Sequence, residues 1–209
     1  MKEYHKIKWI YRFDEKTHLP IQELDEYFND IKDNQWIFTE KIDWTNIRII
    51  RDWHKPEFAG RTDNAMIPPR LLKRLQEVFM EELFEQKFWE QPVILYWEWY
   101  WGKIQKWGVY KDTEDVILFD VEINNTRLKR ENVEDIANYF WVPIVPILCM
   151  WTLDEWIAHV RDWIRKDQDW LVCKWVIEWL VWTPEWWYLD RMWKRIIVKI
   201  KQDYFRTKL

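Results

Sequence analysis

Apolar and polar residues alternate with different periods along this chain, and each period predicts a different kind of element. After Pro20, apolar side chains recur at helical spacing and predict a helix. Its apolar positions are Ile21, Leu24, Tyr27, Phe28 and Ile31. From residue 36 to residue 50, β-branched residues and short alternations predict two strands joined by a turn at Asp43 and Trp44.

The rest of the chain continues this mixture. A second helix is predicted to start at Pro68 or Pro69, because proline suits the first turn of a helix, and to continue through residues 71–84. Thr152 and Glu155 have the spacing of a capping box, in which two side chains satisfy the free amides of a helix N-terminus. The other predicted elements are strands at 92–98, 115–124, 171–181 and 195–201 and helices at 131–140 and 152–164.

This order of elements predicts an α+β fold with largely antiparallel sheets and flanking helices. At 209 residues the chain has the length of one substantial domain. No internal repeat or low-complexity linker divides it. We expect a single domain over residues 1–209, with residues 1–35 as an N-terminal helical extension and no separate C-terminal domain.

Composition argues against several classes of protein. The formal net charge of −4 means that contact with nucleic acid would need a local basic patch. Cys149 and Cys173 are too few for a disulfide framework, which suits a reducing compartment. The N-terminus has no apolar leader and no segment has the length of a membrane span, so we expect a cytoplasmic protein without a membrane partner. The histidines lack the spacing of zinc ligands.

Tryptophan fills 20 of the 209 positions, whereas glycine fills only 3. Average usage would give a chain of this length about 15 glycines. Many of the tryptophans stand where a tight turn or a close backbone approach to a ligand would need glycine, and an indole cannot supply that conformational freedom. Such positions are Trp44, Trp97, Trp99, Trp101, Trp107 and Trp193.

Three explanations of this excess are open. The tryptophans could form an unusual core, in which residues at spacing two share one strand face. They could be stacking platforms for bases or sugars. They could also stand for glycine, if the gene uses the codon UGA for glycine and was translated with a table that reads UGA as tryptophan. We favour the third explanation, although Trp36 reads as a genuine hydrophobic residue beside the first strand.

Lysines recur with strand spacing at two places. Lys41 and Asp43 lie two residues apart, so both side chains share one face of a strand. Taken alone, such a pair reads as a solvated ion pair. Lys199 and Lys201 have the same spacing near the end of the chain. Three lysines that converge on one pocket would suit a polyphosphate.

Carboxylates and one aromatic residue complete the candidate chemistry. Glu98, Asp120 and Glu178 each lie on or beside a predicted strand, where they could hold a ribose hydroxyl or a divalent cation. Phe119 could stack on a purine ring, although an isolated phenylalanine is more often part of a core.

Read with glycine in place of the suspect tryptophans, the chain contains TEKIDGTNIRI, AGRTDNA, LYGEGYGGKIQKGG, ILFDVEIN, IEGLV and RIIVKIKQDYF, in that order. This series resembles the nucleotidyltransferase domain of ATP-dependent RNA ligases, in the superfamily that includes DNA ligases and messenger-RNA capping enzymes. The resemblance covers residues 36–205. It implies an antiparallel-sheet, ATP-grasp-like nucleotidyltransferase domain with flanking helices.

The resemblance implies a role for each residue of these motifs. Lys41 would be the nucleophile that takes AMP from ATP, supported by Asp43 and Asn46 of the same motif. Arg61 would contact the nucleotide or the 5′-phosphate strand, and Glu98 would bind the ribose.

The later motifs act on the base, the metal and the phosphates. Phe119 would stack on adenine, and Asp120 would assist the later steps. Glu178 would bind the metal ion beside the nucleotide. Lys199 and Lys201 would bind and neutralise the phosphate in the transition state, a role that suits phosphoryl transfer because it depends on positioning and charge stabilisation.

The implied reaction forms a lysyl-AMP with release of pyrophosphate, transfers AMP to an RNA 5′-phosphate, and seals with a 3′-hydroxyl. ATP and Mg²⁺ or Mn²⁺ are the implied cofactors, and RNA ends or a nicked duplex are the implied partners of a monomeric enzyme. A small ATP-dependent DNA ligase is the alternative within the superfamily. If the tryptophans are literal, Trp44 would fill space that ATP needs, and a non-catalytic module for single-stranded RNA or an inactive protein is the alternative.

Overall fold

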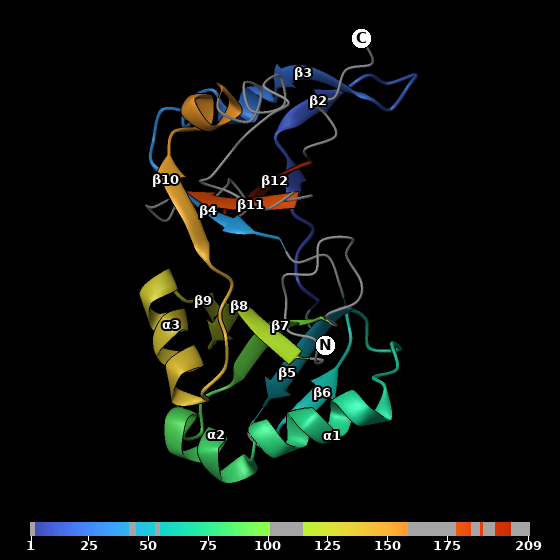
Figure 1. The fold of residues 1–209 in the computed structure, drawn as a ribbon, viewed down its shortest axis with the longest axis vertical. Helices are drawn as coiled ribbons and strands as arrows, with labels where there is room; N and C mark the ends of the chain where they lie inside the picture. Colours follow the sequence, from blue (N-terminus) through green and yellow to red (C-terminus); the bar gives the residue numbers. More distant parts are fainter. Residues whose placement is uncertain are drawn as a thin grey trace, which may run out of the picture. The chain divides into compact units, whose positions relative to one another are not determined.

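The computed structural model describes residues 3–41, 45–52, 55–100, 115–158, 179–184, 189 and 195–201. Contacts within the chain divide it into two compact units (Figure 1). Unit 1 comprises residues 1–5 and 42–145, and unit 2 comprises residues 6–41 and 146–209. Each unit contains its own five-stranded sheet.

The sheet of unit 1 is antiparallel throughout, with the strand order β6-β5-β7-β8-β9. Its strands are β5 (Thr45–Arg51), β6 (Glu57–Ala59), β7 (Val93–Tyr100), β8 (Asp115–Ile123) and β9 (Thr126–Arg127). An Asn124–Asn125 turn with positive φ angles joins β8 to β9, as expected for asparagine in a tight hairpin. The predicted strands at 92–98 and 115–124 are confirmed.

Three helices lie along one side of this sheet (Figure 1). They are α1 (Pro69–Val78), α2 (Glu81–Phe88) and α3 (Arg130–Tyr139). Their apolar faces form a continuous core with the strands, in which Leu75, Phe84 and Ile136 are buried. Burial of such an apolar stripe is what stabilises short helices, since isolated helices of this length are marginal in water.

The single helix predicted to run through residues 71–84 is wrong at one point, because Phe79 and Met80 interrupt it. Phe79 leaves the helical region with φ −107° and ψ 64°, and Met80 is extended. The Phe79 ring is buried and packs 4.9 Å from the Trp97 ring, between centroids. The break therefore places an aromatic side chain in the core, where continuous helical periodicity would not predict it.

The sheet of unit 2 has the strand order β1-β12-β11-β4-β10. Its strands are β1 (Lys8–Trp9), β4 (Trp36–Glu40), β10 (Ile147–Trp151), β11 (Trp179–Pro184) and β12 (Val198–Lys201). All pairs are antiparallel except β1 with β12. The two strands predicted between residues 36 and 50 exist as β4 and β5, but they belong to different sheets, and the turn expected at Asp43 and Trp44 lies outside the described residues.

The helix predicted after Pro20 is wrong, and residues 1–35 do not form a helical extension. Residues Pro20–Leu24 form strand β3, which pairs with β2 (Tyr11–Phe13) in a two-stranded sheet. Only the short 3-10 helix Glu26–Phe28 follows. Proline lacks an amide donor but is tolerated at the start of a strand, so Pro20 fits either element.

The capping box at Thr152 and Glu155 is confirmed. The Glu155 amide donates to Thr152 Oγ1 at 3.2 Å, and the Thr152 amide donates to Glu155 Oε2 at 2.8 Å. The bond from the Thr152 amide, with another from the Thr152 hydroxyl, keeps the pKa of the Glu155 carboxyl below its usual value. Residues 153–158 are helical, and residues 159–164 of the predicted helix lie outside the described part of the chain.

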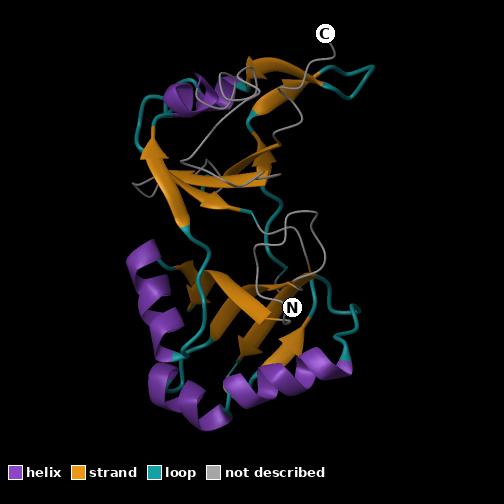
Figure 2. Ribbon diagram, viewed as in Figure 1, coloured by secondary structure: helices purple, strands orange, loops and turns teal. Residues whose placement is uncertain are grey.

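The core of unit 2 lies against one face of its sheet and includes Trp36, Phe38, Trp156 and Val198. Trp36 is fully buried, and its indole Nε1 donates to the Ile31 carbonyl at 3.0 Å. This unit consists mainly of strands in its described part (Figure 2). No helix among the described residues is long and apolar enough to cross a membrane.

Candidate functional site

One face of the unit 1 sheet carries several of the predicted site residues. Ile47 of β5 lies opposite Trp97 of β7, and both are buried in the helical core. Successive side chains of a strand point to opposite faces, so the next pair, Asn46 opposite Glu98, lies on the face away from the helices. The Asn46 Oδ1 atom is buried and has no hydrogen-bond partner among the described residues. A buried acceptor of this kind is a candidate contact for a ligand hydroxyl or amide.

A β-bulge brings Phe119 and Asp120 to the same face. Phe119 is the extra residue of β8 at the point where the register with β7 shifts. Leu118 and Val121, on either side, both pack in the helical core, so the two residues between them lie on the opposite face. The pairs that flank the bulge are Tyr96 with Asp120 and Trp97 with Leu118.

Asp120 is 1% exposed and is held by a network of hydrogen bonds. Its Oδ2 accepts from the Tyr4 hydroxyl at 2.8 Å and from Arg127 Nη1 at 3.3 Å. Its Oδ1 accepts from the Val121 amide at 3.0 Å. These contacts fix the orientation of the carboxylate, which suits a positioning role more than direct proton transfer.

Arg127 connects the acidic and aromatic parts of this face. Its Nε lies 2.9 Å from Glu122 Oε2 in an ion pair between largely buried side chains. Its guanidinium carbon lies 4.5 Å from the centre of the Tyr4 ring and 4.0 Å from that of Tyr96, within the range of cation–π attraction. Burial raises the pKa of Tyr96 to about 12, so its phenol stays protonated at neutral pH.

Phe119 is half-buried at the edge of this aromatic group. Its ring meets Tyr4 edge to face at 5.1 Å and lies 6.2 Å from the Tyr96 ring, between centroids. Edge contacts of this kind hold a ring in place while leaving one of its faces available.

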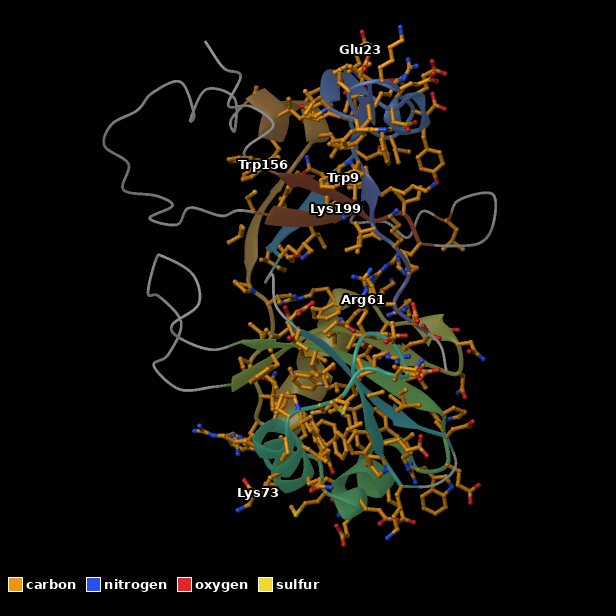
Figure 3. The ribbon with its side chains drawn as sticks, turned by 90° about the vertical axis from the view of Figure 1, so that its right-hand side faces the viewer. Trp9, Glu23, Arg61, Lys73, Trp156 and Lys199 are labelled. Carbon is orange, nitrogen blue, oxygen red and sulfur yellow. The ribbon has the colours of Figure 1, made fainter. Side chains whose placement is uncertain are left out.

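Arg61 lies in the loop that follows β6 and is exposed (Figure 3). It belongs to unit 1, as do Asn46, Glu98, Phe119 and Asp120. The structure therefore brings four of the predicted residues onto one sheet face and places Arg61 on a loop of the same unit.

The predicted lysines belong to the other unit. Lys41 follows Glu40, the last residue of β4, which pairs with Leu180 of β11. Lys199 of β12 lies opposite Val181 of β11, which in turn lies opposite Thr39 of β4. The Lys199 ammonium lies 4.2 Å from the centre of the Trp9 ring (Figure 3).

Lys201 lies two residues further along β12, opposite Trp179. Lys199 and Lys201 therefore belong to one strand of the unit 2 sheet, and Lys41 directly follows another, with β11 between the two strands.

Two predicted site residues, Asp43 and Glu178, lie outside the described residues, as does Trp44. Glu178 directly precedes Trp179, the first residue of β11. Within the described part of the chain, no group of three or more His, Cys, Asp or Glu side chains could hold a metal ion.

The sequence reasoning missed Tyr4, Glu122 and Arg127, which complete the network around Asp120. Glu122 could have been found, because it alternates with Asp120 on a predicted strand. The hairpin signal Asn124–Asn125 would have placed Arg127 opposite Glu122. Tyr4 carries no sequence signal, because its contact with Asp120 joins residues 116 positions apart.

No family model matches the chain, and no curated protein matches it significantly. Solved structures do match. An archaeal ATP-dependent RNA ligase superimposes with a TM-score of 0.62 at 16% identity, over 98% of this chain and 49% of that protein. The fold is that of an ATP-dependent ligase nucleotidyltransferase domain.

Other ligases give the same result. A putative ATP-dependent DNA ligase from Aquifex aeolicus matches with a TM-score of 0.60 at 14% identity, over 98% of this chain and 51% of that one. An RNA ligase of Naegleria gruberi matches with a TM-score of 0.61 at 17% identity, over 96% of this chain and 60% of that one. The chain thus spans about half to three fifths of the length of these ligases. The expected α+β, antiparallel-sheet ligase fold with flanking helices is confirmed.

Proposed function

We propose that this chain is the nucleotidyltransferase domain of an ATP-dependent RNA ligase that acts through a covalent lysyl-AMP. Two features of the chain support this proposal. The motifs fall in the order typical of these ligases, and the chain has the ligase fold, with Asn46, Glu98, Phe119 and Asp120 on one face of its sheet.

Lys41 is the proposed nucleophile. Its Nζ donates an electron pair to the α-phosphorus of ATP, so an N–P bond forms while the bond from the α-phosphorus to the bridging oxygen of the β-phosphate breaks. Pyrophosphate leaves with that oxygen, and the lysine nitrogen gives up a proton to solvent. Lys199 and Lys201 would stabilise the charge that develops on the phosphate oxygens.

The unit 1 face would bind the nucleoside. Glu98 and Asn46 lie opposite each other on adjacent strands. Their side-chain oxygens can accept hydrogen bonds from ribose hydroxyls. Phe119 would stack on the adenine ring. Asp120, held by Tyr4 and Arg127, would keep this face ordered through the later steps.

A divalent cation belongs to the proposal as well. Glu178 would hold Mg²⁺ or Mn²⁺, since both prefer carboxylate oxygen ligands. Such an ion would neutralise charge on the phosphates. Structures of the Naegleria gruberi RNA ligase contain AMP with Mn and ATP with Mn.

The proposal includes glycine rather than tryptophan at positions 44, 97, 99 and 179 of the natural protein, which lie within or beside the motifs. Trp97 gives one reason. It is fully buried, and its indole N–H has no acceptor among the described residues. Buried tryptophan normally finds an acceptor, as Trp36 does. Trp44 would stand between the nucleophile and Asn46 in the sequence, beside the bound nucleotide.

The RNA preference rests on the series GEGYG and IQKGG, read with glycine, which is typical of the RNA-ligase branch. Matched nicked RNA and DNA duplexes would separate the two substrates. We expect faster sealing of the nicked RNA duplex. Equal or faster sealing of the all-DNA nick would instead favour a small DNA ligase.

The test of the covalent step uses ATP labelled in the α-phosphate, with the protein carrying glycine at the four positions. We expect a labelled protein band with Mg²⁺ that disappears in Lys41→Ala. Lys16→Ala, which removes an exposed lysine, serves as the matched control and keeps the band. A band that persists in Lys41→Ala would contradict the assignment of the nucleophile.

A non-catalytic module that binds single-stranded RNA through its aromatic residues is the alternative from another class. It predicts RNA binding that needs neither ATP nor Lys41. It also predicts that glycine at positions 97 and 99 weakens binding, whereas the ligase proposal predicts a gain of adenylation.

A further inference from the structure

The loop that carries Arg61 is held by a buried arginine. The Arg48 side chain is completely buried in β5, with its Nε donating to the Gly60 carbonyl at 2.8 Å. Its Nη2 donates to Asp63 Oδ1, also at 2.8 Å. These two acceptors lie on either side of Arg61 in the sequence. Arg48 therefore fixes the loop just before and two residues after Arg61.

The loop is also tightly folded at its start. A Cβ atom built on Gly60 would lie 2.6 Å from the Cβ of Ala65, so no larger residue fits there without a shift. The hydrogen bond from Arg48 keeps the pKa of the Asp63 carboxyl below its ordinary value, so this carboxylate is ionised at neutral pH. A buried guanidinium needs such partners, because an unpaired buried charge is strongly destabilising.

Arg48 also connects this loop to the sheet face described above. It lies opposite Tyr96 of β7, and Tyr96 lies opposite Asp120 of β8. The anchor of the loop and the aromatic group beside Phe119 therefore occupy one row across the sheet.

We propose that Arg48 is a positioning residue that sets the direction of the Arg61 side chain toward the phosphate-bearing substrate. This inference rests on the proposed ligase function. Nothing in the charge pattern of the sequence distinguishes Arg48 from a surface arginine. Its burial and its two hydrogen bonds give it this role.

A double-mutant cycle tests this positioning role while the buried Arg48 side chain stays in place. Asp63→Ala removes one partner of Arg48 at a half-exposed position, and Glu57→Ala removes an exposed carboxylate on β6 as the matched control. We expect Asp63→Ala and Arg61→Ala each to raise the ATP concentration for half-maximal adenylation about tenfold. The double variant should show no further rise, and Glu57→Ala should behave like the parent. Independent, multiplicative effects would overturn the proposal.

Hydrogen exchange separates this inference from the function itself. If the parent protein forms no adenylate, the ligase proposal fails. The loop is then judged by the exchange rates of the amides at residues 60–65. We expect these rates to rise in Asp63→Ala and to stay unchanged in Glu57→Ala. Equal rates in the parent and in Asp63→Ala would overturn the role of Arg48 as the anchor of the loop.

A second, independent observation concerns the backbone at two exposed tryptophans. Asparagine tolerates a positive φ, but for a bulky residue the same angle is a steric outlier. Trp89 has φ 50° and Trp141 has φ 54°. The other described non-glycine residues with positive φ are His18, Asn124 and Asn125.

Trp141 occupies the position that usually takes glycine in a Schellman motif at the end of α3. The Val142 amide donates to the Ala137 carbonyl at 3.0 Å, and the Trp141 amide donates to the Asn138 carbonyl at 3.2 Å. This bond pattern requires a left-handed residue just after the helix cap. The apolar contact of Val142 with the helix core and the following Pro143 complete the motif.

Trp89 follows α2 in an even less usual conformation. Its φ of 50° and ψ of −130° match the second residue of a type II′ turn, where glycine is strongly preferred. The Gln91 amide closes this turn by donating to the Phe88 carbonyl at 2.9 Å. Arg51 Nη1 donates to the Trp89 carbonyl and holds it in this orientation.

Neither side chain offsets this backbone strain by burial. Trp89 is 72% exposed and Trp141 is 94% exposed. Both follow helices of unit 1, whereas the candidate nucleotide-binding residues occupy the opposite face of the sheet. We infer that positions 89 and 141 are glycine in the natural protein. Replacement of glycine by tryptophan then extends along the chain. A stacking function would instead require the tryptophans to be confined to the ligase motifs.

Thermal unfolding tests this inference without any assay of ligation. Strain of this kind costs about 1–3 kcal/mol per residue, so Trp89→Gly and Trp141→Gly should each raise Tm by about 2–6 °C. Trp36→Gly is the matched control and should lower Tm, because it removes a buried, hydrogen-bonded indole. A fall in Tm in both helix-end variants would overturn the inference. The codons UGG at positions 89 and 141 of the gene would also overturn it.

Discussion

The two sheets of this molecule carry different chemistry. The candidate face of unit 1 presents carboxylate, amide and aromatic side chains, held by the ion pairs of Arg127. The unit 2 sheet instead carries Lys199 and Lys201 on β12, and Lys41 directly follows β4, the second strand along. The first set suits a nucleoside, and the second suits phosphates.

This difference predicts separable kinetic effects. Substitutions on the unit 1 face should weaken binding of the nucleotide and raise KM. Lysine substitutions in unit 2 should slow the chemical step and lower kcat, because their charge matters most as negative charge develops in the transition state.

Lys199→Ala has the largest expected effect. We expect the rate of adenylation to fall by about 10²–10³-fold, as for removal of one donor to a developing oxyanion, with little change in KM for ATP. Single-turnover rates at varied ATP concentration measure both quantities, and Lys16→Ala is the control. A rise in KM without a fall in the rate of adenylation would contradict the assignment of the unit 2 lysines to the chemical step.

Glu98→Ala should act in the opposite way. Loss of the carboxylate proposed to bind a ribose hydroxyl should raise KM for ATP by about 10–100-fold, with a smaller change in kcat. Glu90→Ala, which removes an exposed glutamate after α2, is the control. If kcat alone falls, Glu98 takes part in the chemical step and the assignment of the unit 1 face to binding is wrong.

Tyr4→Phe should destabilise unit 1 by a smaller amount. It removes the hydroxyl that donates to Asp120 while keeping the ring contacts with Phe119 and Arg127. A hydrogen bond to a charged group contributes about 1.5–3 kcal/mol, which predicts a fall in Tm of about 3–6 °C. Tyr139→Phe removes a hydroxyl that donates to the Leu83 carbonyl, and it should lower Tm by less. Equal falls in Tm would mean that the Asp120 network contributes no special rigidity.

Glu155→Gln tests unit 2 and has the smallest expected effect. Hydrogen bonds from Thr152 lower the pKa of Glu155 in the folded protein, so its stabilising contribution is present above the ordinary value of 4.5. It is lost as pH falls below that value. We expect Glu155→Gln to lower Tm at pH 7, and we expect the difference from the parent to shrink as pH falls below 4.5. A difference in Tm that is independent of pH would contradict the charge-based account.

Local patterns predicted strands β4, β5, β7, β8 and β12 and helix α3, but they failed where tertiary contacts decide. The apolar spacing after Pro20 fits a helix as well as a strand, and pairing of β3 with β2 selects the strand. The break at Phe79 buries its ring against Phe84 and Phe140, a contact that no periodicity contains. The strands β4 and β5 were predicted, but their separation into two sheets depends on distant partners.

The sequence likewise predicted some residues of the candidate site and not others. Ordered motifs pointed to Lys41, Glu98 and Lys199, because chemistry-bearing residues at strand spacing leave a trace in the sequence. The residues that hold such groups in place do not, since Tyr4 and Arg48 act through contacts across the fold. The sequence therefore predicts candidate chemical groups, whose roles stay predictions, and does not predict the residues that hold them.

The most direct test of the account is to locate the covalent product. The protein with glycine at the proposed positions is incubated with ATP and Mg²⁺, digested, and analysed by peptide mass spectrometry under conditions that preserve an N–P bond. We predict an AMP adduct on the peptide that contains Lys41, absent without ATP. An adduct on another lysine, or none in a folded protein that binds ATP, would contradict the proposed mechanism.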